Sequence, residues 1–314
     1  MSAFVHLHVH SEYSPMQGVS TLEALCQTSR TQGAETLALT DTNGLYGAIR
    51  FIEIAQAYGL HPILGAELTH NRHRAVLLIK DSFGYTNLCR LLSQRHCDPA
   101  FDCIASVQEH RRGLIVLSDD LPALTAWKRH SPTDLYVELS PGALMHQALG
   151  FSRRAHLPPV ATNRVHFVTP QEFPLHQILR AIALNTTLSQ LPPDACCAPN
   201  HWLMPPATLA SQFPHVPHAM ANTWKIAQQC RTEWSFKETI FPSFRQLSDP
   251  HAFTLLREKT YDGARWRYGS LTSPVIERIE RELGVIRDKS YAHYFLVVEE
   301  IVRQAPRTCG RGSA

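Results

Sequence analysis

The chain is predicted to fold as an α/β barrel of seven strand–helix units, followed by a short, mainly helical segment. Three observations support this prediction: seven short apolar runs before residue 163, amphipathic helical patterns between most of them, and short connections. Alternating strands and helices predict a parallel sheet, and seven repeats favour a closed barrel over an open sheet.

Hydrophobic patterns locate the elements of this barrel. The strands are expected at 4–9, 36–40, 62–68, 75–79, 113–118, 135–139 and 159–162. The helices between them are expected at 21–32, 47–59, 85–95 and 142–155. In such barrels the functional side chains lie where strands end and loops begin.

The chain changes character after the barrel. Seven prolines fall within about 186–218, which predicts a connection that runs over the surface. Helical patterns then return at 218–231, 251–269 and 273–305, with Ser248 or Asp249 as an N-cap and a break near Lys289-Ser290. We expect one domain over 1–245 and an incomplete second domain over 246–314.

Composition narrows the cellular context. A net charge of +3 over 314 residues permits contact with nucleic acid without implying it, since no dense run of Lys or Arg is present. The eight cysteines form no C-x-x-C pair, which favours reduced thiols. No signal peptide and no continuous apolar stretch of about 18 residues is visible. The expected location is the cytoplasm, without a membrane partner.

Polar side chains that can ligate metals gather at the expected strand ends. The first strand contains HLHVH, in which alternation should direct His6, His8 and His10 to one face. Each such residue alone is better explained by structural hydrogen bonding, but their common placement predicts two or three Zn²⁺, Mn²⁺ or Fe²⁺ ions that activate water for phosphoester hydrolysis. The candidates are His8, His10, Asp41, Glu67, Asp119, Asp120, Glu138 and His166.

Five segments together resemble the PHP (polymerase and histidinol phosphatase) domain. They are HLHVHSEYS, ALTDTNGLYGAIRF, PILGAEL, GLIVLS and VATNRVHF. More narrowly, they resemble the PHP domain at the N-terminus of bacterial family C DNA polymerases, the polymerase III alpha subunits. The final segment, RIERELGVIRDKSYAHYFLVVEEIVRQAPRTCGRGSA, resembles the opening of the palm in that family and is closest to its error-prone branch. The resemblance implies a distorted (β/α)7 barrel of PHP type.

The resemblance also implies a metal site that this chain has partly lost. Residues that match the ligand positions of the family are His8, His10, Asp41, Glu67 and His166. At four further positions the family usually has, in order, a carboxylate, a histidine, a second histidine and an aspartate. This chain has Gln17, Thr42, Arg74 and Arg164 there. The sequence therefore leaves open whether this degenerate site binds Zn, Mn or Mg.

Arginine cannot ligate a cation, because its guanidinium group stays protonated and offers no lone pair. It can supply positive charge beside carboxylates that would otherwise be buried without a partner, at a cost of several kcal/mol. The hypothesis is that Arg164, together with Arg74, pairs with Asp41 or Glu67 and replaces the missing metal ions. The alternative is that both arginines point to solvent.

The glycine-rich end is the second functional signal. By resemblance to the palm, its backbone N–H groups would bind the phosphates of an incoming nucleotide. The residues concerned are Gly310, Arg311, Gly312 and Ser313. In the family, the carboxylates that bind the two catalytic Mg²⁺ ions lie downstream of this turn, so Mg²⁺ is implied for the complete polymerase only, and we do not expect this polypeptide alone to polymerise DNA.

The resemblance therefore implies the N-terminal part of a DNA-directed DNA polymerase of replication or translesion repair, with a structural PHP site. Its implied partners are DNA, through the complete polymerase, and either the remaining palm and fingers or other replisome or translesion subunits. Two alternatives remain. One is a metal-dependent phosphoesterase or 3′–5′ exonuclease, and the other is a stand-alone enzyme of the histidinol phosphatase type, which the palm-like end argues against.

Overall fold

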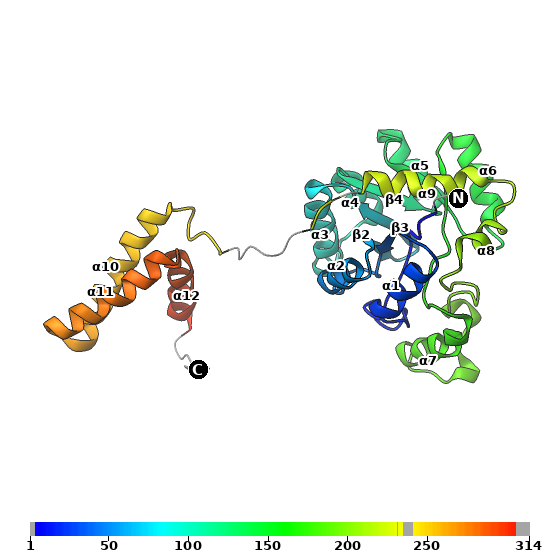
Figure 1. Cartoon of the computed structure of the whole chain (residues 1–314). Helices are drawn as coiled ribbons and strands as arrows, with labels where there is room; N and C mark the ends of the chain where they lie inside the picture. The colour runs from blue at the N-terminus through cyan, green and yellow to red at the C-terminus, as the bar shows by residue number, and fades with distance from the viewer. Residues whose placement is uncertain (1–3, 231, 235–240, 306–314) are drawn as a thin grey trace. The chain divides into compact units, whose positions relative to one another are not determined.

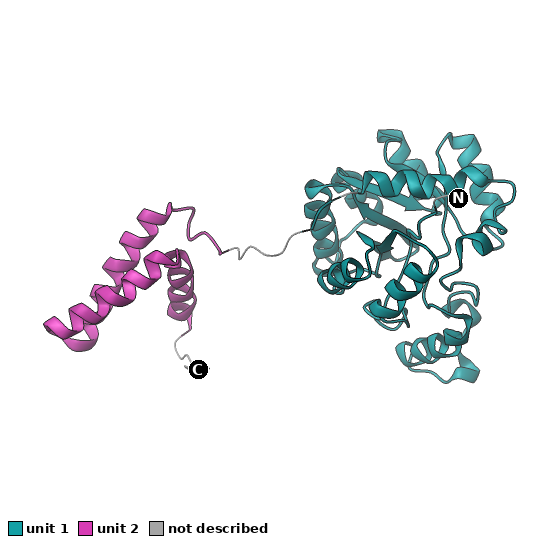
Figure 2. Cartoon of the chain, in the orientation of Figure 1, with its two compact units in different colours: residues 1–234 teal, residues 235–314 magenta. Residues whose placement is uncertain are grey.

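A computed structural model describes residues 4–230, 232–234 and 241–305 of the chain (Figure 1). The chain divides into two compact units, Met1–Trp234 and Ser235–Ala314 (Figure 2). The first unit contains the whole sheet and the helices around it. The second is a small group of helices.

The first unit is built on one mixed sheet of six strands in sequential order. Strand β3 runs antiparallel to both of its neighbours, and the other neighbouring strands are parallel. The strands are β1 (Thr36–Leu39), β2 (His61–His70), β3 (His73–Ile79), β4 (Leu114–Ser118), β5 (Leu135–Leu139) and β6 (Pro159–Ala161).

The expectation of an entirely parallel sheet is wrong at β3. Only Asn71 and Arg72 separate β2 from β3, and a parallel crossover needs a dozen or more residues. Asn71 takes a left-handed backbone conformation with φ +54°, which suits the tight turn of a hairpin. The HNRH sequence at this turn was the signal that the sequence analysis missed.

The first expected strand is an extended segment that completes the barrel without forming a regular strand. On one side it bonds to β1, since the N–H groups of Ala38 and Thr40 donate to the carbonyls of His6 and Val9. On the other side it bonds to the chain just after β6, where His10 N–H donates to the Val165 carbonyl. The segment therefore joins the two outer strands of the sheet.

This closing segment contains a local irregularity that determines which way its side chains point. The two carbonyls that accept these bonds, of His6 and Val9, are three residue steps apart, whereas their donors, Ala38 and Thr40, are two steps apart. Such an extra residue breaks the alternation of side chains, as in a β-bulge. The expected common face for the three histidines is therefore wrong: His6 bonds to the Met204 carbonyl, away from His8 and His10.

Two apolar layers hold the sheet in place. The inner layer fills the barrel and includes Leu7, Ile63 and Ile115, and Ile226 of helix α9 (Pro217–Gln229) packs into the same cluster. The outer layer lies between the sheet and the surrounding helices and includes Trp127, which is fully buried. Helix α9 thus occupies one end of the barrel and leaves the opposite end for polar side chains.

The helices of the first unit begin at clear sequence signals. Asp81, Asp102 and Asp120 act as N-caps, since the side chain of each accepts a hydrogen bond from the N–H three residues on. The helices are α1 (Leu22–Thr31), α2 (Ala48–Ala57), α3 (Ser82–Cys97), α4 (Cys103–His110), α5 (Leu121–His130), α6 (Met145–Ala155), α7 (Phe173–Ala183), α8 (Pro206–Ala210) and α9. Of these, α4, α5, α7 and α8 were not predicted.

The proline-rich stretch is a mainly irregular connection, as expected. It contains two single 3₁₀ turns, Leu188–Gln190 and Pro193–Ala195, and the short helix α8. Its residues 200–203 return to the barrel, where the Phe167 carbonyl accepts a hydrogen bond from the N–H of Leu203. The connection therefore contributes side chains to the open end of the barrel.

The second unit consists of α10 (Asp249–Tyr268), α11 (Ser273–Asp288) and α12 (Ala292–Gln304). Its core includes Leu256, Leu283 and Leu296. The expected cap at Ser248 and the break after Asp288 are confirmed, and Ser290 has a left-handed φ of +57° at that break. Among the described residues, no helix is long and apolar enough to cross a membrane.

Candidate functional site

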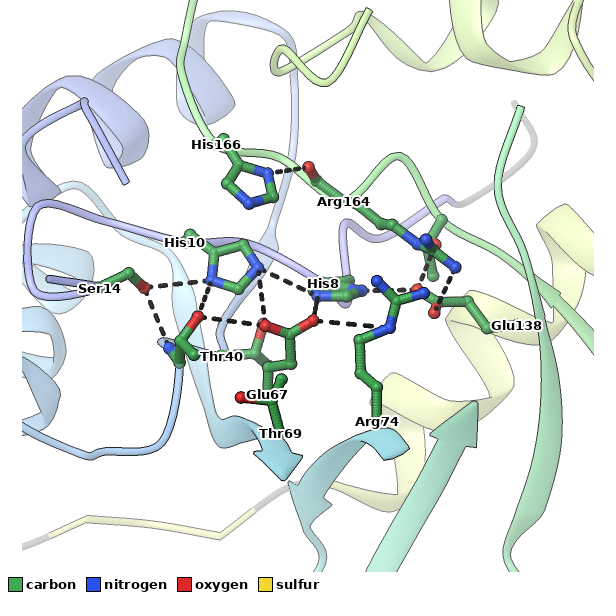
Figure 3. A network of polar contacts seen from close by, with 12 residues as sticks. His8, His10, Ser14, Thr40, Glu67, Thr69, Arg74, Glu138, Arg164 and His166 are labelled. Atoms are coloured by element: carbon green, nitrogen blue, oxygen red, sulfur yellow. Dashed lines mark hydrogen bonds and ion pairs between the residues drawn. The ribbon is translucent and has the colours of Figure 1, made fainter. Parts of the chain in front are cut away.

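Charged and polar side chains converge at the end of the barrel opposite α9. They come from the closing segment, from the ends of β2, β4 and β5, from the start of β3 and from the loop after β6 (Figure 3). A cleft of about 670 Å³ opens beside them and is lined by Arg74, Asp119, Glu138, Arg164 and His201, among others. This is the open end at which barrel proteins place their functional groups.

His8 lies at the centre of the site, between two carboxylates. Its Nδ1 is 2.6 Å from Oε1 of Glu138, and its Nε2 is 3.4 Å from Oε1 of Glu67 (Figure 3). All three side chains are buried. Burial opposes a charged ring, but Glu138 and Glu67 outweigh it and raise the pKa of His8 above 6.5. The protonated ring can donate to both carboxylates.

His10 continues the network from His8. The Nε2 atoms of the two rings are 3.1 Å apart, and Nδ1 of His10 lies 3.1 Å from Oγ of Ser14 and 3.3 Å from Oγ1 of Thr42. Burial lowers the pKa of His10 to about 3, so its ring is neutral. Its Nε2 can accept from His8 while its Nδ1–H donates to a hydroxyl, which satisfies both rings without a metal ion.

Both arginines of the site point into it and share one aspartate. Arg74 Nη2 is 2.7 Å from Oδ1 of Asp119, and its Nε is 3.8 Å from Oε1 of Glu67. Arg164 Nη2 is 2.6 Å from Oδ2 of Asp119 and 3.3 Å from Oε2 of Glu138. The hypothesis placed the arginines on Asp41 or Glu67; Arg74 contacts Glu67, whereas Arg164 contacts Asp119 and Glu138 instead.

Asp41 lies apart from the arginines, which corrects that half of the hypothesis. Its Oδ1 accepts from the N–H of Ser11 at 2.7 Å and from Oγ of Ser14 at 2.6 Å, and its Oδ2 accepts from Oγ of Ser11 at 2.9 Å. Burial raises the pKa of Asp41, and the bonds from the two serines oppose that rise. Asp41 therefore organises the turn after the closing segment.

The buried charges of this network balance. Burial by itself would raise the pKa of each carboxylate, yet neighbouring cations hold all three values below the usual range. With protonated His8, three cations face three carboxylates. The cations are His8, Arg74 and Arg164, and the carboxylates are Glu67, Asp119 and Glu138. We call these six residues the ion-pair network.

The contribution of the ion-pair network to stability is expected to depend on pH. Carboxylates with depressed pKa values stabilise the fold above their unfolded pKa of about 4 and lose that effect as pH falls. His8, with a raised pKa, stabilises the fold below 6.5 and loses that effect as pH rises through its folded value. We expect the contribution of the network to the free energy of unfolding to be largest between about pH 4.5 and 6.5. It is superimposed on an opposite trend from His6, His10 and His201, whose lowered pKa values favour the fold as pH rises. Urea titrations of the unmodified chain and of Glu138→Gln therefore measure the difference in the free energy of unfolding at each pH, which should be greatest in this window. An unchanged pH profile in that variant would contradict the assignment.

The donor set does not fit a cluster of two or three metal ions. His8, His10 and Glu67 place ligand atoms within 4.8 Å of one another, which is a set for one ion. Further ligands would be needed where the chain has Thr42, Arg74 and Arg164, and Thr42 already donates to Oε2 of Glu67 at 3.1 Å. Arginine cannot ligate, and its charge repels a second cation. The network occupies the place that further ions would take.

His166 belongs to a second group of side chains. Its ring lies 4.3 Å from the ring of His10, but its ligand atom groups within 4.8 Å of those of Cys197 and His201. The sequence analysis did not single out Cys197 and His201, because more than 30 residues separate them from the motif that contains His166. The remaining prediction, nucleotide contacts at Gly310, Arg311, Gly312 and Ser313, lies outside the described residues.

Comparison with known proteins matches two parts of the chain to two families. The PHP domain family matches residues 6–147, and the family described as the bacterial DNA polymerase III alpha NTPase domain matches residues 254–314. An error-prone DNA polymerase of Symbiobacterium thermophilum is 34% identical over 99% of this chain. Over nearly its whole length the chain is therefore similar to bacterial polymerases of the DNA polymerase III alpha type. The DNA polymerase III alpha subunits of Vibrio cholerae and Bacillus subtilis are 28% and 27% identical, again over 99% of the chain.

The matches cover different shares of this chain and of the proteins compared with it. The chain spans about a third of the length of its curated relatives, namely 33% of the Symbiobacterium protein and 31% of the Vibrio protein. Among solved structures, an amidohydrolase from Chromobacterium violaceum aligns with 52% of this chain and 88% of its own, at 14% identity and a TM-score of 0.40. The match of residues 6–147 to the PHP domain family, together with the mixed sheet and its surrounding helices, confirms the predicted α/β fold of PHP type.

Proposed function

We propose that this chain is the PHP-bearing part of a DNA-directed DNA polymerase of replication or translesion repair, and that its PHP centre is structural. The observation that supports a structural centre is the ion-pair network, in which Arg74 and Arg164 neutralise buried carboxylates that would otherwise require cations. In a site of the PHP type, hydrolysis of a phosphoester would use a bound ion to activate water, and no such step is assigned to this site.

The same proposal covers the partners and the location. The homology to DNA polymerase III alpha subunits supports DNA and other replication or translesion subunits as partners, in the cytoplasm. DNA synthesis, with its Mg²⁺ ions, is assigned to the complete polymerase. The rigid PHP unit then serves as a platform that stabilises the polymerase or docks a partner. The match of residues 254–314 to the polymerase family argues against a stand-alone phosphatase.

An assay of metal-dependent hydrolysis tests the structural role. The purified chain is incubated with end-labelled single-stranded DNA and with p-nitrophenyl phosphate, each with Zn²⁺, Mn²⁺ or Mg²⁺. We expect no metal-dependent product, and no difference between the unmodified chain, His10→Ala and the matched control His215→Ala, an exposed histidine.

The alternative is a phosphoesterase or 3′–5′ exonuclease that uses one ion, and the three ligand atoms of His8, His10 and Glu67 favour it. That function predicts metal-dependent hydrolysis that survives His215→Ala and is lost in His10→Ala. This result would overturn the structural role.

A further inference from the structure

Three residues at the open end of the barrel form a group that the ion-pair network does not use. His166 lies in the loop after β6, and Cys197 and His201 lie in the proline-rich connection. Their ligand atoms are all within 4.8 Å of one another. The group contains one thiol and two imidazoles and no carboxylate, so its chemistry differs from that of the network.

The ring of His166 is oriented as a metal ligand would be. Its Nδ1–H donates to the carbonyl of Arg164 at 2.7 Å, which leaves Nε2 with a free lone pair. Metal-binding histidines usually donate their second ring N–H to a carbonyl or a carboxylate in this way. The ring of His201 stacks on that of His166, with 5.8 Å between centroids and 21° between planes.

His176 fixes the backbone that presents the thiol. Its Nε2 accepts a hydrogen bond from the N–H of Cys197 at 3.0 Å, and its Nδ1–H donates to the carbonyl of Gln17 at 2.8 Å. The His176 ring is only 1% exposed. Cys197 is thereby tied to the loop after the closing segment, whereas its neighbour Cys196 is not part of the group.

One nitrogen in the group lacks a partner. Nδ1 of His201 is buried, and no hydrogen bond reaches it among the residues that the structure describes. Buried polar atoms in native proteins are nearly always bonded, so an unpaired one calls for an explanation. A cation bound by this ring at Nδ1 would give the unpaired nitrogen a partner. His201 also lines the cleft, which gives the cation a route from solvent.

We propose that His166, Cys197 and His201 bind one Zn²⁺ ion. Thiolate sulfur and imidazole nitrogen are both ligand types of Zn²⁺, and three protein ligands leave a fourth position for water. Binding exchanges the Cys197 S–H bond for a zinc–sulfur bond and releases the proton to solvent. This site goes beyond the proposed function: it joins the proline-rich connection to the barrel and is independent of Glu67 and the ion-pair network.

Cobalt serves as the optical probe for this site. The full chain is freed of metal with a chelator and titrated with Co²⁺, then with competing Zn²⁺. We expect one equivalent to produce a thiolate-to-cobalt charge-transfer band that Zn²⁺ removes. Cys197→Ser should abolish the band and Cys196→Ser should keep it, while His201→Ala should weaken binding at least tenfold.

A measurement on the unmodified chain covers the case in which a variant fails to fold. Bound Zn²⁺ should slow alkylation of the Cys197 thiol at least tenfold, as read by peptide mass mapping, and leave the Cys196 rate unchanged. Absence of both the band and this protection would overturn the site. So would a band that requires Cys196, or binding that is lost in Glu67→Gln. None of these results depends on the hydrolysis assay, so the two proposals fail separately.

Discussion

Replacement of Arg164 by alanine is expected to destabilise the first unit by about 3 kcal/mol, because it removes one member of a buried charge network. Arg164 contacts Asp119 at 2.6 Å and Glu138 at 3.3 Å, and the Glu138 side chain is only 1% exposed. Without the guanidinium group, three carboxylates face two cations. Arg164 has a left-handed φ of +47°, and alanine keeps the Cβ, so backbone strain is unchanged and the loss reports the charge.

Urea denaturation followed by tryptophan fluorescence, to which the fully buried Trp127 contributes, and by circular dichroism measures this loss. The matched control is Arg50→Ala, which breaks a pair with Glu23 at 3.2 Å between side chains that are 59% and 48% exposed. An exposed pair contributes about 0–1 kcal/mol. A loss in Arg164→Ala no larger than that of the control would contradict the structural role of the network.

The double change Arg74→His with Arg164→Asp is expected to create metal binding at the PHP centre. It removes both fixed cations and introduces the residue types that the resemblance to the PHP domain implies at these positions. Histidine and aspartate can ligate, and the freed Glu67, Glu138 and Asp119 become available beside His8. Aspartate also tolerates the left-handed backbone at position 164 better than most residues do.

Mass spectrometry of the metal content after dialysis against Zn²⁺ or Mn²⁺ measures this gain. We expect at least one equivalent more than in the unmodified chain. The control Arg72→His with Arg153→Asp changes the net charge equally at two exposed positions and should add none. If the double variant folds and gains no metal, the arginines are not what prevents the cluster from forming.

Local sequence was sufficient for most of the secondary structure. Apolar runs located six of the strands, because a buried strand needs a short apolar segment wherever it lies. The hairpin between β2 and β3 and the irregularity between His6 and Val9 were missed. The hairpin has a local signal in its two-residue turn, Asn71-Arg72. The irregularity depends on hydrogen bonds between segments, and it changes which face each histidine occupies.

The arrangement of the functional site could also be predicted from the sequence only in part. The motifs placed His8, His10 and Glu67 together because parallel strands bring their ends to one edge. Whether Arg164 faces Asp119 and Glu138 or Asp41 could not be predicted, since the four residues come from four loops or strand ends. The choice depends on side-chain direction at angstrom scale.

The sequence by itself determined the resemblance of this chain to polymerase-type PHP domains, its barrel class and the residue types at the ligand positions. The tertiary structure alone decided that Asp119 serves both arginines, that Asp41 is satisfied by serine hydroxyls, and that Cys197 and His201 return to His166. The physical reason is the distance over which each effect acts. Propensity and periodicity act between neighbours in sequence, whereas the compensation of buried charge acts through space between whichever groups the fold brings within about 4 Å.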